Sequence, residues 1–254
     1  MTVYLDNNII VSIENGDYTL DSVKSVLPNG KLRFFYSSAH IFEVESFPGN
    51  SSISKDDLLT KRLDTVRNIF KNNYLYLDLN GNRLTHIMED PREVYDTITL
   101  VPSGITAIKG FMNLISKEQK EDIRRQLGID ILKLNNYSAI EVIDHLNTKL
   151  TSWGTNQSFL EMIEYGIQLH PDGKKFGLHN RIAGVFELLD MFGYWKDKET
   201  PTSNYARLWD AEHCFFASYC DFFISDDRRT RNKAAVVYNV YNKDTKIISS
   251  GDSK

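Results

Sequence analysis

The sequence contains only two cysteines, Cys214 and Cys220, among its 254 residues. Both lie in one stretch with a helical pattern, and together they offer neither a disulfide framework nor a zinc site, so we expect buried reduced thiols. Proline and glycine are also few, at 6 and 14 residues, and no segment is repeated or of low complexity. Long disordered regions are therefore not expected.

No apolar run is long enough to span a bilayer, and the first residues have a strand pattern rather than that of a signal peptide. We therefore expect no membrane association and a cytoplasmic location. The sequence also lacks an excess of basic residues, because 34 acidic and 30 basic side chains give a net charge of −4. This balance argues against general coating of polyanions and leaves open a local basic patch.

An ordinary globular composition remains, with 41% hydrophobic and 25% charged residues. Both ends of the chain alternate short apolar runs with helical patterns, which predicts α/β structure with a parallel sheet. The predicted strands are residues 2–5, 32–36, 222–225 and 245–249. The predicted helices of these terminal parts cover residues 39–46, about 203–220 and 228–242.

The middle of the chain is mostly helical in pattern, with one short strand predicted at 74–79. Its predicted helices cover 55–72, 117–127, 138–150, 157–169 and 178–195. Serines with capping character precede four of them, at Ser54, Ser116, Ser138 and Ser158. We therefore predict a core formed by residues 1–49 and 203–254, with residues 50–202 as a large α-helical insertion or cap.

Acidic residues follow two of the predicted strands. Asp6 comes directly after residues 2–5, and Asp226 and Asp227 come directly after residues 222–225. Because ligands bind at the carboxyl ends of strands in open parallel sheets, the two clusters are expected to converge. Grouped carboxylates repel one another unless a cation lies among them, so the pattern indicates a metal-dependent hydrolase. Alternatively, Asp6 is a loop residue and the pair caps a helix.

Two further acids occur in apolar surroundings. Glu43 lies about one turn into the helix after residues 32–36, and Asp210 lies in the middle of an apolar helix, where an unpaired charge is costly. Glu43 could instead be a rim residue paired with Lys or Arg. His213, one turn after Asp210, fits a packed core histidine better than a residue acting at the site.

Three arginines, Arg228, Arg229 and Arg231, follow the acidic pair in the first turn of the last helix. Cations oppose the helix dipole there, and a bound anion such as a phosphodiester would offset that cost. A solvated charged face that partly neutralises Asp226 and Asp227 is an equally good interpretation.

Taken in order, these motifs resemble the PIN-domain family of metal-dependent nucleases. The motifs are Asp6 followed at the second position by Asn8, Ser38-x-x-x-x-Glu43, Asp210-Ala-x-His213 and Ser225-x-Asp227. The resemblance covers roughly residues 1–47 and 203–249, and the long segment between them matches nothing in the family. Each motif is short, so the specificity lies in four matches in the right order.

The resemblance implies a three-layer PIN-like core and an endoribonuclease that leaves 5′-phosphate and 3′-hydroxyl ends. Its implied cofactor is Mg²⁺ or Mn²⁺, one ion or two, held by Asp6, Glu43, Asp210 and Asp227, with Asp226 as an alternative or additional ligand. It implies supporting roles for Asn8 and Ser225, and Arg228, Arg229 and Arg231 as phosphate contacts. The implied partner is single-stranded or structured RNA, and an inhibitor protein or a homodimer stays open.

Three other functions remain open at this stage. A haloacid-dehalogenase-like phosphatase also has an Asp after its first strand, but it needs a second Asp where this chain has Asn8. A non-catalytic RNA-binding PIN-like module would have no need of four acids. A DNA-directed nuclease of related fold differs only in its groove and cap, which the sequence does not describe.

Overall fold

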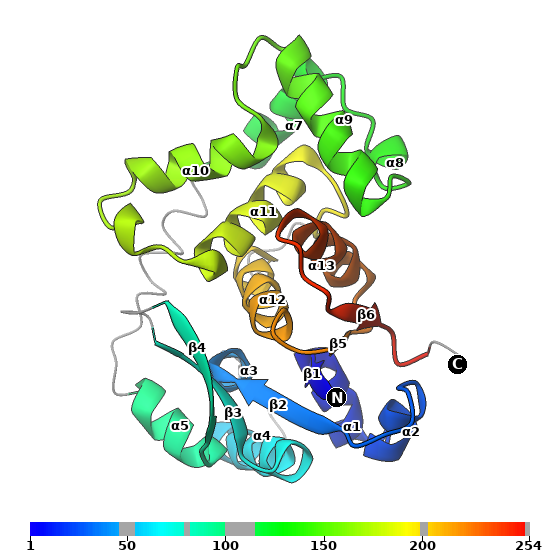
Figure 1. The fold of residues 1–254 in the computed structure, drawn as a ribbon, viewed down its shortest axis with the longest axis vertical. Coiled ribbons are helices and arrows are strands. Elements are labelled where there is room, and N and C mark those ends of the chain that lie inside the picture. Colours follow the sequence, from blue (N-terminus) through cyan, green and yellow to red (C-terminus); the bar gives the residue numbers. More distant parts are fainter. Residues whose placement is uncertain (46–53, 79–81, 100–114, 199–202, 252–254) are drawn as a thin grey trace. The chain divides into compact units, whose positions relative to one another are not determined.

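A computed structural model describes residues 1–45, 54–78, 82–99, 115–198 and 203–251 (Figure 1). The chain divides into two compact units. The first combines Met1–Ser103, His213–Arg231 and Asp244–Lys254, and the second combines Gly104–Glu212 and Asn232–Lys243. Each unit therefore draws on segments that are far apart in the sequence.

The first unit contains a six-stranded sheet of order β4-β3-β2-β1-β5-β6. All neighbouring strands are parallel except the antiparallel pair β3 and β4. The strands are β1 (Thr2–Leu5), β2 (Arg33–Ser37), β3 (Asn73–Asp78), β4 (Arg83–Met88), β5 (Phe222–Ile224) and β6 (Lys246–Ile248). The sequence-based prediction of an α/β protein with a parallel sheet is thereby confirmed for the α/β class and for four of the five strand pairs, and β3 and β4 add strands from outside the two ends of the chain.

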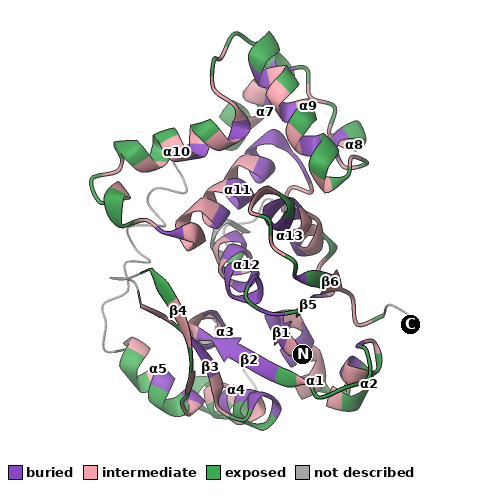
Figure 2. Cartoon of the chain, viewed as in Figure 1, coloured by how far each residue is buried: buried purple, intermediate pink, exposed green. Residues whose placement is uncertain are grey.

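Strand β1 lies at the centre of this sheet, between β2 and β5. Val3 pairs with Phe34 on one side and with Phe222 on the other. Val3, Tyr4 and Leu5 are fully buried, and Figure 2 shows β1 in the purple of buried residues. A strand covered on both faces has a continuous apolar sequence instead of an alternating one, so the sequence alone predicts a strand here.

Five helices of the first unit come from the N-terminal part of the chain. They are α1 (Asn7–Asn15), α2 (Leu20–Ser25), α3 (Ser38–Glu45), α4 (Lys55–Phe70) and α5 (Pro91–Thr99). Their apolar side chains and alternate residues of the strands form one buried cluster that includes Val3, Leu5, Ile9, Val66 and Phe70. This packing holds fixed the loops at the carboxyl ends of β1, β2 and β5.

The edge strand β4 was not predicted from the sequence. Its residues are mostly partly buried or exposed, so they form no apolar run that marks a strand. Strands β3 and β4 and helices α4 and α5 all fall within 50–202, so part of the predicted helical insertion contributes to the sheet unit. The predicted boundaries at residues 49–50 and 202 lie outside the described residues.

The second unit is helical in its described part. Its helices are α7 (Lys117–Gln126), α8 (Ile131–Leu134), α9 (Ala139–Ser152), α10 (Phe159–Leu169) and α11 (Leu178–Phe192), with a 3-10 turn at Gly173–Lys175. It also holds most of α12 (Ser203–Ala217) and α13 (Arg228–Val240). Ser116, Ser138 and Ser158 form capping boxes, and Ser54 caps α4 in the first unit, as the sequence predicts.

A buried ion network joins the helices of the second unit. The Arg207 side chain is only 2% exposed and contacts Glu187 at 2.7 Å, Asp190 at 2.8 Å and Asp197 at 3.1 Å. Lys233 is 3.1 Å from Asp197 and 3.8 Å from Asp190. Burial acts to raise the pKa of Asp190, but the charges of Arg207 and Lys233 and further contacts together outweigh it, so this pKa lies below its usual value. Removing one partner of such a buried pair destabilises a protein, because the other charge is left buried without a counter-charge.

Two bulk expectations can be compared with the structure. Cys214 and Cys220 are both buried, as predicted, and neither forms a disulfide within the described residues. Within the described ranges, no helix combines the length and the apolar character that crossing a membrane requires.

Candidate active site

Loops from three adjacent strands meet at one edge of the sheet in the first unit. Asp6 follows β1, Ser225 follows β5, and β2 leads directly into α3, which carries Glu43. The backbone amide of Asp6 donates a 2.8 Å hydrogen bond to the carbonyl of Ile224, so the β1 and β5 loops continue the pairing of their strands. The parallel topology therefore collects residues from both ends of the chain at this edge.

Asp6 is 3% exposed and serves as the N-cap of α1. Its Oδ1 accepts a 2.7 Å hydrogen bond from the Asn7 amide. Its Oδ2 accepts bonds from the Asn8 side-chain amide at 2.7 Å and from the Ser225 hydroxyl at 2.5 Å. Three donors thus fix the orientation of this buried carboxylate.

Burial is the largest influence on Asp6, and it raises the pKa of this carboxyl above its usual value. The charge of Glu43 acts in the same direction, whereas His213, when it carries a second proton, and the hydrogen bond from Ser225 act against it. Asp6, Glu43 and His213 are therefore close enough to act on one another electrostatically. A buried negative charge next to a second carboxylate is unfavourable, and a nearby cation would relieve it.

Glu43 is paired with a histidine. Its Oε2 lies 3.0 Å from Nε2 of His213, and the Glu43 side chain is 20% exposed while that of His213 is 1% exposed. Nδ1 of His213 lies 2.9 Å from the Tyr4 hydroxyl. The expected core histidine is thus buried and hydrogen-bonded, but its partner is one of the predicted site carboxylates.

Ser225 and Asn8 connect the loops that carry the acids. The Ser225 hydroxyl donates to Asp6 and accepts bonds from the Asn8 side-chain amide and the Asp227 backbone amide, both at 3.2 Å. The side-chain carbonyl of Asn8 accepts a 3.2 Å bond from the Asp226 amide. Each of these polar groups therefore faces the loop carrying another predicted site residue.

The two adjacent acids have different surroundings. Asp227 caps α13, because its Oδ1 accepts bonds from the amides of Arg229 at 2.7 Å and Thr230 at 3.3 Å. Its Oδ2 accepts no bond from a residue that the structure describes. Asp227 can therefore cap the helix with one oxygen and offer the other to a cation.

The Asp226 carboxylate instead accepts four hydrogen bonds of 2.5–2.9 Å. Its donors are the Tyr18 hydroxyl, the Ser249 hydroxyl, and the amide and hydroxyl of Ser250. Burial acts to raise its pKa, but the bonds from Ser250, Ser249 and Tyr18 outweigh burial and lower it. A metal at Asp226 would have to replace these donors, so this carboxylate tethers the segment after β6.

Asp210 belongs to the second unit and is partly buried. It lies one turn before His213 in α12, and His213 belongs to the first unit. The structure thus places Asp6, Glu43 and Asp227 within one unit together with Asn8 and Ser225, and Asp210 outside that unit.

The three arginines differ in their surroundings. Nη1 of Arg231 donates a 2.6 Å bond to the backbone carbonyl of Ser225, so this side chain supports the loop. Arg228 is exposed and Arg229 is partly buried, both in the first turn of α13. Arg229 and Arg228 are thus better placed than Arg231 to meet a phosphate.

A divalent cation fits the chemistry of this edge. Carboxylate oxygens are the ligands that Mg²⁺ and Mn²⁺ prefer, and Mg²⁺ is commonly held by one or two carboxylates with waters and substrate phosphates completing its shell. In the described ranges, no three His, Cys, Asp or Glu side chains form a group that could hold a metal ion by themselves. An ion bound at this edge would need oxygens of substrate or water to complete its shell.

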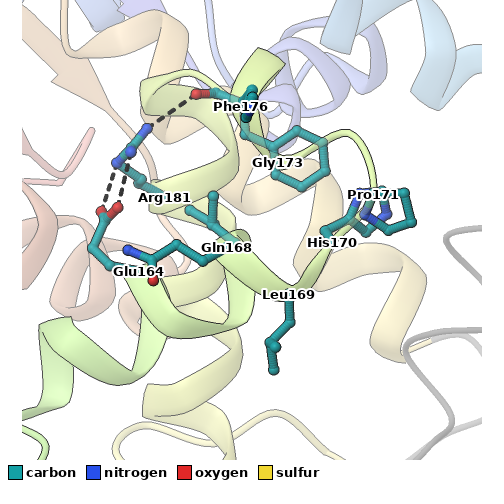
Figure 3. Close-up of a pocket in the computed structure, with 10 residues that line it drawn as sticks. Glu164, Gln168, Leu169, His170, Pro171, Gly173, Phe176 and Arg181 are labelled. Atoms are coloured by element: carbon teal, nitrogen blue, oxygen red, sulfur yellow. Dashed lines mark hydrogen bonds and ion pairs between the residues drawn. The ribbon is translucent and has the colours of Figure 1, made fainter.

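A separate pocket lies in the second unit, between α10 and the start of α11 (Figure 3). Its volume is about 570 Å³, and its wall includes Leu169, His170 and Phe176. The ring centroids of His170 and Phe176 lie 4.6 Å apart, and the two rings are tilted by 38°. The guanidinium of Arg181 is held by Glu164 through bonds of 2.6 and 2.9 Å (Figure 3). No predicted site residue lines this pocket.

Sequence reasoning missed the polar side chains beneath Glu43. Tyr4, Ser37 and His40 are fully buried and hydrogen-bonded to one another, but they lie singly in apolar runs, where the sequence gives no signal of a connection. Only the three-dimensional structure shows that they meet His213.

Comparison with known proteins found no matching family model, no matching curated protein and no matching solved structure.

Proposed function

We propose that this chain is a divalent-metal-dependent endoribonuclease with a PIN-like core. The observation that carries the proposal is the pair of carboxylates, Asp6 and Glu43, at the carboxyl edge of a mostly parallel sheet. Asp6 is buried with a raised pKa, and the charge of Glu43 adds to that shift. A site that stores unfavourable negative charge is suited to a cation.

In this proposal Asp6 and Glu43 hold Mg²⁺ or Mn²⁺ together with oxygens of water and substrate phosphate, and Oδ2 of Asp227 would join them only when the ion is bound. The family resemblance also implies Asp210 as a ligand, and this remains an expectation from the sequence. Asp226 is left out of the ligand set because four donors already occupy its oxygens. When bound, the cation would supply Lewis-acid polarisation of the phosphodiester and activation of a water.

In this proposal, residues of the chain orient the Asp6 carboxylate and neutralise the charge of the phosphate. Asn8 and Ser225 hold the Asp6 carboxylate in one orientation through bonds of 2.7 and 2.5 Å. Arg228 and Arg229, in the first turn of α13, would neutralise part of the phosphate charge. Hydrolysis with release of the 3′ oxygen as hydroxyl leaves the phosphate on the 5′ end of the product.

Asn8 separates this proposal from a phosphatase of the haloacid dehalogenase type. That chemistry needs a carboxylic acid two positions after the first Asp, whereas Asn8 donates its amide hydrogen to Asp6. An amide has no proton to give to a leaving group at neutral pH. The choice of RNA over DNA as substrate rests on the family resemblance alone.

The test combines Mn²⁺ binding with cleavage of a 5′-labelled single-stranded RNA and the same sequence in DNA. Wild-type protein should bind Mn²⁺ in a calorimeter and cut RNA only when the ion is present. Asp6→Asn and Glu43→Gln should lose both properties. Asp226→Asn is the matched control, an adjacent acid that should keep both.

Three outcomes would contradict the proposal. The first is absence of Mn²⁺ binding by folded wild-type protein, which would favour a non-catalytic RNA-binding module. The second is unchanged cleavage by Asp6→Asn. Cleavage of DNA alone would retain the metal site and overturn the assignment of RNA.

A further inference from the structure

We propose that His213 is a positioning residue: it fixes the Glu43 carboxylate through a buried relay of hydrogen bonds that starts at Ser37. This inference rests on the proposed metal site, because it assigns a role in building that site. The relay runs from Ser37 through Tyr4 and His213 to Glu43, and all four residues belong to the first unit.

The relay is short and buried along its length. The Ser37 hydroxyl lies 2.6 Å from the Tyr4 hydroxyl, which lies 2.9 Å from Nδ1 of His213. Nε2 of His213 lies 3.0 Å from Glu43 Oε2. Ser37, Tyr4 and His213 are all 0% exposed, so water cannot replace any of these partners.

Counting hydrogens gives the relay a direction. An ionised Glu43 accepts only, so Nε2 of His213 carries a hydrogen. The Ser37 oxygen accepts a 3.2 Å bond from the Ala39 amide, and its own hydrogen has the Tyr4 oxygen as acceptor. Tyr4 then donates to Nδ1 of His213. Every hydrogen has an acceptor when His213 is the neutral Nε2–H tautomer.

A second buried histidine, His40, is the other nearby acceptor for the Tyr4 hydroxyl, but its ring nitrogens already have partners. Nε2 of His40 lies 2.8 Å from the carbonyl of Leu5 and must donate to it, while Nδ1 accepts a 3.0 Å bond from the Ser37 amide. Nδ1 of His40 is thus already occupied and lies at the longer distance of 3.4 Å from Tyr4. The shorter bond to His213 is the one that the Tyr4 hydrogen makes.

The relay matters because Glu43 is a flexible side chain at a partly exposed position. A glutamate loses rotamer freedom when it binds an ion, and a fixed donor removes that freedom before the ion arrives. Partners of this kind orient metal-binding side chains, and their loss lowers metal affinity by about 10–100-fold. His213 therefore acts through Glu43 and does not itself need to contact the ion or the RNA.

The first test uses metal-free protein, so it is independent of the proposed function. Histidine labelled with ¹⁵N reports the tautomer of each ring by NMR. The relay predicts the neutral Nε2–H tautomer for both His213 and His40. A neutral Nδ1–H tautomer or a fully protonated ring at His213 would overturn the proposed direction of the relay.

The second test compares variants by Mn²⁺ calorimetry and thermal unfolding. His213→Leu keeps the volume and removes the donor, so Mn²⁺ affinity should fall about 10–100-fold. His213→Gln restores an N–H near the position of Nε2 and should recover most of that loss. Cys214→Ala is the control, since it perturbs the same buried helix outside the relay and should leave the affinity unchanged.

Tyr4→Phe removes one hydroxyl, and it decides the question if His213→Leu does not fold. It should lower Mn²⁺ affinity less than His213→Leu, because the donor to Glu43 remains but the tautomer is no longer fixed. Equal Mn²⁺ affinity in wild type, His213→Leu and Tyr4→Phe would overturn the relay while leaving the metal site standing. Absence of Mn²⁺ binding in wild type would instead overturn the proposed function, and the tautomer result would still judge the relay.

Discussion

Ser225 donates a 2.5 Å hydrogen bond to Asp6 across 219 positions of the sequence. The same hydroxyl accepts bonds from Asn8 and from the amide of Asp227. One small side chain thus links the loop after β1 to the loop after β5. The relative positions of Asp6 and Asp227 depend on it.

Ser225→Ala tests that dependence. Asp6 loses one of its three donors in a buried site, so we expect the free energy of unfolding to fall by about 1–3 kcal/mol. Mn²⁺ affinity should fall as well, because Asp6 is no longer held in one orientation. Urea unfolding and calorimetry measure the two effects. Ser152→Ala, which removes an exposed hydroxyl bonded to its own helix, is the control and should change neither.

Mn²⁺ should stabilise the protein through Asp6. The folded-state pKa of Asp6 is raised, so the folded protein holds this proton more tightly than the unfolded chain does. Its contribution to stability is complete below the unfolded pKa and is lost as pH rises through the folded pKa. At neutral pH a cation offsets the loss, and saturation at 100 times Kd adds about 2.7 kcal/mol. Thermal unfolding with and without Mn²⁺ should show this gain in wild type; an equal gain in Asp6→Asn would place the ion elsewhere.

Asp226 should have the opposite pH dependence. Its folded-state pKa is lowered, so its contribution to stability is present above the unfolded pKa and is lost as pH falls through the folded pKa. Asp226→Asn should therefore reduce stability at neutral pH and have a smaller effect in acid. Urea unfolding at several pH values measures this. A loss of stability that stays constant with pH would show that the charge of Asp226 is unimportant.

The arginines should separate into two classes. Arg229→Ala should weaken RNA binding and reduce the salt dependence of the affinity by about one ion, with little change in stability. Arg231→Ala removes the bond to the Ser225 carbonyl, so it should lower the free energy of unfolding more than it weakens RNA binding. Fluorescence anisotropy at several salt concentrations, beside thermal unfolding, distinguishes them. Equal RNA affinity and salt dependence in wild type and Arg229→Ala would favour a solvated charged face.

Arg207 should be critical for the second unit. Arg207→Met leaves Glu187, Asp190 and Asp197 without their main buried counter-charge, and such losses typically cost about 3–5 kcal/mol. The control is Arg125→Ala, which removes an exposed pair within one helix and should change stability by less than about 0.5 kcal/mol. Urea unfolding measures the free energy of unfolding of each variant, and a similar loss in Arg207→Met and Arg125→Ala would contradict a structural role for the network.

The position of Asp6 and the α/β class could be predicted because β1 is buried on both faces and has a distinct apolar run. The capping serines could also be predicted, because a capping box involves only residues within one turn of the sequence. The edge strand β4 could not be predicted, because its residues are exposed or partly buried and show no regular alternation of apolar and polar side chains.

The distinction between Asp226 and Asp227 could not be read from two adjacent identical residues. It depends on Tyr18 and on Ser249 and Ser250, which only the folded chain brings to Asp226. The partner of Glu43 was equally hidden, because His213 lies 170 positions away. Local sequence encodes caps and strand ends, whereas these pairings are set by the topology.

The central place of β1 has a consequence for folding. Its neighbour β5 and the hydroxyl of Ser225 follow it in the chain by more than two hundred residues. Pairing segments so far apart closes a long loop, and long-range contacts of this kind slow folding. We therefore expect the carboxylate edge to be among the last parts of the first unit to form.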